Sequence, residues 1–127
     1  MISDGLLTVG IYARQRLLAD PEVRSLVGDR IYPSVAPEGT EGAFIVYERD
    51  SYNELHSKMG VYMEEAQLGY EIVSADYDTG LQLMLALHRV LKGKHENYTF
   101  QTILSREFYE EKKHRQILVF KIKDYGI

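Results

Sequence analysis

The stretch that decides the fold is Ala66-Gln67-Leu68-Gly69-Tyr70-Glu71-Ile72. Apolar residues alternate here with polar residues and glycine, and successive side chains of a β-strand point to opposite faces of its sheet. The alternation therefore predicts a strand, which we place at 61–74, with one buried face and one open face. A sheet of this kind needs a second layer over its buried face, and helices supply that layer in an α+β domain.

The segment after this strand predicts the covering helix, from Asp76 or Asp78 to about Lys92, with Gly93 as its stop. Aspartate is a favoured N-cap because its carboxylate accepts hydrogen bonds from free N–H groups of the first turn. A helix that only lies on a sheet needs one apolar stripe. This helix has two, which are Leu81, Met84, Leu85, His88 and Leu91, and Leu83, Leu87 and Val90. We expect its second partner to be the first helix of the chain or a neighbouring subunit.

Two helices are expected before the first strand. Apolar residues spaced by three and four predict a helix over 3–19. A second, short helix is expected to have Asp20 as its N-cap and Pro21 at its first position. Gly28 follows this helix and is expected to be its left-handed terminal residue.

The remaining elements are expected to be extended. Short or moderate strands are predicted at 30–33 and 43–51, with a polar loop over 52–60. A terminal hairpin is predicted at 98–109 and 116–125, joined by a charged turn. The side chains expected to share a buried face are Phe100, Leu104 and Phe108 in its first strand, and Leu118, Phe120 and Ile122 in its second. The prediction is an α+β fold, a mostly antiparallel sheet of about four to five strands covered by about two to three helices.

Length and composition indicate a single globular domain over 1–127, because the chain has 127 residues of which 45% are hydrophobic and 27% are charged. The sequence has no cysteine, which excludes disulfides, thiolate catalysis and zinc–thiolate sites. A net charge of −4 argues against direct nucleic-acid binding, because phosphates attract basic surfaces. Met1-Ile2-Ser3-Asp4 lacks the features of a signal peptide and no apolar stretch reaches the ~18 residues of a membrane span, so we expect an intracellular protein that binds no membrane.

No catalytic, cofactor-binding or metal-binding motif is found. Glu64 and Glu65 are adjacent in a predicted strand, so they point to opposite faces and do not converge on a substrate. No two of the four histidines have the i, i+4 spacing of a helical metal site. We therefore expect a protein that is not an enzyme and has no cofactor. The alternative is a small-molecule-binding or enzymatic α+β domain whose site is built from distant residues.

The stretch from Leu17 to Tyr47 carries a family resemblance. Its matching parts are Leu17-Leu18-Ala19-Asp20-Pro21, Leu26-Val27-Gly28-Asp29-Arg30-Ile31-Tyr32-Pro33, Val35-Ala36-Pro37 and Ile45-Val46-Tyr47. This pattern resembles the tail-completion proteins of long-tailed bacteriophages and prophages, also called tail-terminator or head–tail joining proteins. The later order also fits, with a long strand ending in Ser74-Ala75-Asp76-Tyr77, a helix and a final strand pair. Only the segment 52–65 departs from the family pattern.

The resemblance implies a structural protein with no enzymatic activity and no cofactor. Such proteins are small α+β units that assemble as a six-fold ring, a hexamer, at the head-proximal end of the tail tube. The ring stops tube polymerisation and presents a surface to the head connector. The implied partners are other copies of the chain, the tail-tube protein and the head-connector proteins. The implied location is the host cytoplasm during assembly and then the tail or neck of the virion.

Candidate contact residues for such an assembly lie in two places. We expect Tyr52, Leu55 and Met59 to help bind the tail tube or the connector, because aromatic and apolar anchors dominate binding at interfaces. The other reading of this segment is a hairpin loop without a partner. A ring also needs heterologous contacts, in which one face of a subunit meets a different face of the next. Leu83, Leu87 and Val90 are expected to supply an apolar patch for that contact.

Overall fold

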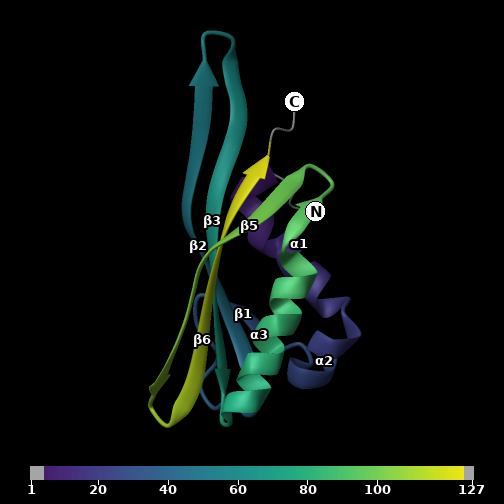
Figure 1. The fold of residues 1–127 in the computed structure, drawn as a ribbon, viewed down its shortest axis with the longest axis vertical. Coiled ribbons are helices and arrows are strands. Elements are labelled where there is room, and N and C mark those ends of the chain that lie inside the picture. The colour runs from purple at the N-terminus through teal and green to yellow at the C-terminus, as the bar shows by residue number, and fades with distance from the viewer. Residues whose placement is uncertain (1–4, 125–127) are drawn as a thin grey trace.

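The structure is a computed structural model that describes residues 5–124, and it confirms the predicted α+β fold (Figure 1). Within this range three α-helices, α1 (Val9–Leu18), α2 (Pro21–Val27) and α3 (Tyr77–Leu91), lie on one face of the sheet. A 3₁₀ turn, η1 (Gly5–Thr8), precedes α1. The helix predicted over 3–19 is thus divided in two, and its first residues, Ser3 and Asp4, lie outside the described range.

The sheet has the strand order β1-β2-β3-β6-β5-β4. Its central strands are β2 (Phe44–Ser57), β3 (Gly60–Ser74), β6 (Lys113–Asp124) and β5 (Tyr98–Glu110), each antiparallel to its neighbour. Two strands of three residues lie at the edges: β1 (Ile31–Pro33) runs parallel to β2, and β4 (Gly93–His95) runs antiparallel to β5. The described sheet therefore has six strands, because β4 forms where the sequence predicts only the end of a helix.

The alternation that predicts β3 is confirmed by its burial. Ala66, Leu68, Tyr70 and Ile72 are all at most 1% exposed and face the helices. Leu118, Phe120 and Ile122 of β6 share this inner face and are equally buried. The opposite face, which we call the outer face, has no helix over it among the described residues (Figure 1).

The short helix α2 begins as predicted. The Oδ2 atom of Asp20 accepts a hydrogen bond from the Val23 N–H at 3.1 Å, and Pro21 takes the first position. Asp20 also accepts hydrogen bonds from Arg89 of α3 at 3.0 and 3.2 Å, so this cap joins two helices. Burial raises the pKa of Asp20, but the hydrogen bonds from Arg89 and Val23 outweigh it and hold that pKa below its ordinary value.

Gly28 ends α2 with a positive φ of 61°, as predicted, but with ψ at −119°. This ψ lies outside the left-handed helical region, so the expected left-handed conformation is wrong in that one respect. The conformation is one that glycine adopts readily and residues with a Cβ atom do not. Position 28 therefore requires glycine more strictly than an ordinary helix C-terminus does.

The N-cap of α3 is Asp76, whose carboxylate accepts hydrogen bonds from the Thr79 N–H at 3.0 Å and the Thr79 hydroxyl at 2.9 Å. Its inner stripe packs on β3, β6, α1 and α2. The expected second partner of the helix is thus the N-terminal helices of the same chain. The side chains on its other side are half-buried at Leu81, Met84 and His88 and exposed at Leu85.

The loop predicted over 52–60 is wrong. β2 continues to Ser57 and β3 begins at Gly60, so the two strands form a long hairpin that projects past the rest of the sheet (Figure 1). β6 pairs with β3 only from Glu64 onward, which leaves the end of the hairpin as a two-stranded ribbon. A ribbon with two exposed faces needs no hydrophobic alternation, so periodicity does not reveal it.

The shared face predicted for Phe100, Leu104 and Phe108 is also wrong. A bulge between Thr102 and Leu104 shifts the register of β5 against β6 by one residue. Because strand side chains alternate, a shift of one residue moves every later side chain to the other face. Phe100 is 2% exposed on the inner face, whereas Leu104 is 48% exposed on the outer face.

Replacing Gly28 with valine should lower the free energy of unfolding by about 1 kcal/mol or more, because a Cβ atom is disfavoured at this positive φ. Urea or thermal unfolding measures the loss. Gly28→Asn is the discriminating variant, because asparagine tolerates the left-handed helical region but not this ψ. A Gly28→Asn protein as stable as the parent would show that the backbone geometry described for Gly28 is incorrect.

Candidate functional site

The end of the β2–β3 hairpin, residues 53–63, is called the hairpin arm below. Most of it lies beyond Glu64, the residue at which β3 stops pairing with β6. Met59 at its tip is 95% exposed, and Val61 and Tyr62 are 44% and 45% exposed. Apolar side chains gathered on a projection that covers nothing in its own chain are typical of an interaction site.

The three residues predicted in this segment lie at different heights of the hairpin. Tyr52 is half-buried at the base of the arm and packs against the core. Leu55 is paired with Met63 along the arm, on the face opposite to that of Tyr52. Met59 is at the tip. The structure therefore brings the three residues onto one projection but not into one contiguous patch.

A carboxylate pair lies at the base of the arm. Glu54 and Glu64 are directly opposite each other on β2 and β3, where like charges destabilise strand pairing. The Tyr52 hydroxyl lies between them, within hydrogen-bond distance of the Glu64 Oε2 atom and 3.2 Å from the Glu54 Oε2 atom. The hydrogen bond to Glu64 is the main reason that the pKa of Tyr52 is raised well above its ordinary value. The phenol thus places a hydrogen-bond donor between the two carboxylates.

The residues predicted on α3 are placed in the core. Leu83 and Leu87 are fully buried and Val90 is half-buried against the same cluster. Their apolar surface is used within the chain, because the helix is rotated so that this stripe faces the core, together with Leu91 of the other stripe. The part of α3 that remains exposed includes Leu85 at 58% and Tyr77 at 40%.

Two long strand edges have no strand partner among residues 5–124. β1 pairs with β2 only at Ile45–Tyr47, which leaves the Glu48–Ser57 edge free. β4 pairs with β5 only at Tyr98–Phe100, which leaves the Gln101–Glu110 edge free. Such edges present unpaired N–H and C=O groups. No signal in the sequence identifies them, because edge position is a property of strand order.

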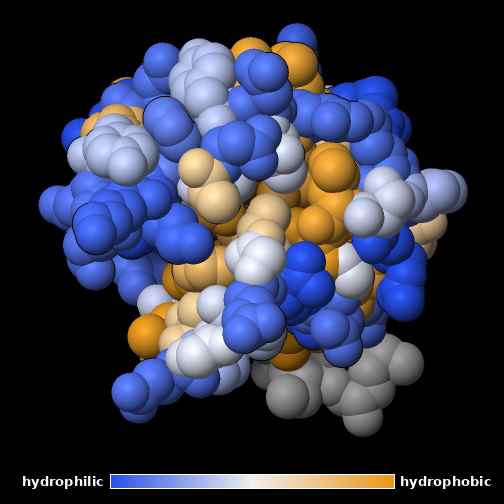
Figure 2. Space-filling view, turned by 90° about the horizontal axis from the view of Figure 1, so that it is seen from below, coloured by the Kyte–Doolittle hydropathy of each residue, from blue (hydrophilic) through white to orange (hydrophobic). Residues whose placement is uncertain are grey.

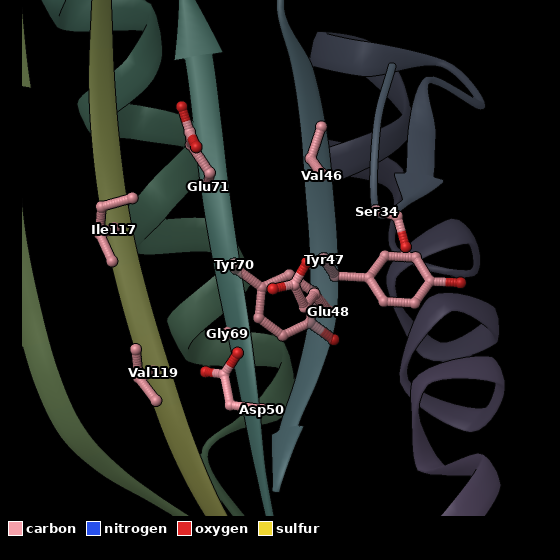
Figure 3. Close-up of a pocket in the computed structure, with 10 residues that line it drawn as sticks. All are labelled: Ser34, Val46, Tyr47, Glu48, Asp50, Gly69, Tyr70, Glu71, Ile117 and Val119. Atoms are coloured by element: carbon pink, nitrogen blue, oxygen red, sulfur yellow. The ribbon is translucent and has the colours of Figure 1, made fainter. Parts of the chain in front are cut away.

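A shallow groove crosses the outer face over β2, β3 and β6 (Figure 3). Its apolar lining comes from Val46, Ile117 and Val119, and its carboxylates from Glu48, Asp50 and Glu71. Figure 3 shows the carboxylates of Asp50 and Glu71 on separate strands and not directed at a common point. Glu71 is paired with Arg115. The groove therefore lacks the convergent polar groups expected of a small-molecule site.

A further groove lies at the end of the sheet away from the arm. Its apolar lining includes Val35, Phe44 and Val73. Figure 2 looks at this end of the molecule and shows apolar surface gathered in the middle of a hydrophilic border. Val35 is 74% exposed. This end of the molecule therefore offers apolar contact area, as the arm does at the other end.

Within residues 5–124 no group of three or more histidine, aspartate or glutamate side chains is placed to hold a metal ion. Of the helices in that range, none is both long enough and apolar enough to cross a bilayer.

The fold is similar to that of a chain in the virion of a native gene transfer agent (GTA) particle. The two structures agree with a TM-score of 0.75 at 20% sequence identity, and the match covers 88% of this chain and 90% of that chain. At this identity the likeness establishes the fold. No protein-family model and no curated protein sequence matches this chain.

Tyr52→Phe should lower the free energy of unfolding at pH 7 by about 1 kcal/mol, because the facing carboxylates lose their shared donor. The native state keeps the phenol protonated after the unfolded chain has released its proton. The parent should therefore lose its advantage over Tyr52→Phe as the pH rises above about 10. Urea unfolding of both proteins across this range measures the difference, with the exposed Tyr109→Phe as control. A difference that stays constant through pH 11 would contradict this role of Tyr52.

Proposed function

We propose that this chain is a structural protein of a phage-like particle, and within such a particle a tail-completion protein. It would cap the tail tube as a ring, a hexamer, and join the tube to the head connector. The observation that carries the proposal is the fold match to a GTA virion chain, which extends over nine-tenths of both chains. The Leu17–Tyr47 pattern supports the finer assignment, because it resembles the same class of proteins.

The distribution of apolar surface supports a role in assembly rather than in catalysis. The exposed large apolar side chains lie on the arm, along strand edges, on helix surfaces and, at Val35, in the connection after β1. An enzyme or a small-molecule carrier concentrates such surface in a concave pocket with a few convergent polar groups. The grooves over the described residues are shallow and lack that convergence.

The arm is the proposed contact with the tail tube or the connector. Tyr52 lies just before the arm at its base, Leu55 lies along its length, and Met59 at its tip is nearly fully exposed. A projecting hairpin reaches beyond the body of its own subunit, so it can contact a neighbouring layer of an assembly. Helix α3 would contribute to the ring contact through its exposed residues Leu85 and Tyr77. The helix is held in place for that contact by Leu83, Leu87 and Val90, which pack in the core.

The deciding experiment measures the mass of the protein in solution by light scattering over a wide concentration range, with negative-stain imaging of any large species. Negative-stain imaging is also applied to tail tubes isolated from the phage-like particle whose genes include this chain. We expect a closed ring, free or at the end of the tube. The triple variant Tyr52→Ala, Leu55→Ala, Met59→Ala should keep its fold and lose tail joining by about ten-fold or more, as expected when interface anchors are truncated.

The matched control replaces three exposed residues away from the arm, Arg24, Glu38 and Glu41, with alanine. This variant should join tails as the parent does. Normal tail joining by the arm variant would exclude the arm as the contact. Finished tails that lack the chain altogether would exclude the tail-completion role itself.

A further inference from the structure

The two free strand edges lie on opposite sides of the same sheet. The order β1-β2-β3-β6-β5-β4 places Glu48–Ser57 on one side and Gln101–Glu110 on the other. The two stretches have the same length, and neither contains a proline. Helices reach them through side-chain hydrogen bonds: the Tyr77 hydroxyl of α3 donates to Glu107, and the Arg49 guanidinium donates to the Leu7 carbonyl of η1. A heterologous ring contact joins one surface of a subunit to a different surface of the next, and two different strand edges on opposite sides of one sheet meet this need.

Exposed apolar side chains accompany both edges. Along β5, Ile103 is 41%, Leu104 is 48% and Tyr109 is 61% exposed. Beside the free part of β2, Leu7 is 46% and Ile11 is 41% exposed in a groove that this strand also lines. A long edge with exposed apolar residues is a template for pairing with another chain, and monomeric proteins usually protect such edges.

Charge also distinguishes the two edges. On the outer face the β2 edge carries Glu48 and Asp50, and Asp50 lies over the backbone at Gly69. The β5 edge carries the exposed Arg106, which pairs in register with Ile117 and so shares that outer face. Antiparallel pairing that puts Arg106 opposite Ser51 places Leu104 opposite Asn53, and it brings Arg106 to the strand that carries Glu48 and Asp50 on the same face. Opposite charges at such cross-strand positions stabilise the pairing.

We propose that the free β2 edge of one copy pairs with the free β5 edge of the next copy as antiparallel strands, so that the sheet continues from subunit to subunit. This inference rests on the proposed ring and names the surfaces that build it. The β2 edge leads toward the arm, whereas the β5 edge leads toward the opposite end of the molecule (Figure 1). Successive copies are therefore offset along the strands, and in a closed sheet such an offset becomes a tilt of the strands against the axis.

Disulfide trapping tests the pairing, and the absence of native cysteine makes the parent a clean background. Antiparallel partners have Cα atoms about 4.5–5.5 Å apart, which a disulfide can bridge. Chains with Asn53→Cys are mixed with chains carrying Leu104→Cys under mild oxidation. The control partner is Ser105→Cys, one residue along β5 and on the other face. The expected result is about ten-fold more mixed covalent dimer with Leu104→Cys than with Ser105→Cys.

The double variant Asn53→Cys, Leu104→Cys in one chain should give a ladder of covalent oligomers that ends at the ring. A second measurement reverses the charges: Arg106→Glu should weaken assembly, and adding Asp50→Lys should restore it. If the parent assembles but the Asn53→Cys and Leu104→Cys chains form no mixed disulfide, or form disulfides only between two Asn53→Cys chains, the edge pairing is overturned and the ring is left in place. If the parent stays monomeric and the cysteine variants form no mixed disulfide, the pairing is also overturned, and the tail-joining assay then decides the proposed function separately.

Discussion

The burial of one sheet face beneath α3 is the constraint on which the rest of the structure depends. Leu68 of β3, Phe120 of β6 and Leu87 of α3 are fully buried at this contact. Each such side chain contributes about 1.5–3 kcal/mol when it leaves water. The helix can approach closely at its first turn because Gly80 has no side chain, and a Cβ atom there would lie 2.5 Å from the Ser74 hydroxyl oxygen. The same contact fixes which stripe of α3 remains exposed and which sheet face stays bare.

Much of this arrangement could be predicted from local patterns. The strand alternation at Ala66–Ile72, the caps at Asp20 and Asp76 and the positive φ of Gly28 each follow from the chemistry of a few neighbouring residues. What could not be predicted depends on partners distant in sequence. The bulge before Leu104 exists only in relation to β6, and β4 exists only because β5 passes beside it. Periodicity within one segment holds no information about either.

The candidate site, too, could be predicted only in part from the sequence. The segment 52–60 can be singled out as a candidate contact from its aromatic and apolar residues, but its strand pairing could not be predicted. The burial of Leu83 and Leu87 could not be predicted, because both stripes of α3 are apolar and only tertiary packing decides the rotation of the helix. The free edges of β2 and β5 were missed because strand order is set by the whole chain. The position of Arg106 on a free strand edge, for example, is known only once that order is known.

The projection of the arm has a consequence for dynamics. A two-stranded ribbon outside the core has few buried contacts to hold it closed, so its amide hydrogens should exchange with solvent well before those of β3 and β6 in the core. Its opening need not unfold the body of the protein, because the Tyr52–Glu64 contact closes the ribbon at its base. A partner that binds the arm would therefore meet a segment ordered at its root and adaptable at its tip, and part of the binding energy would be spent on ordering it.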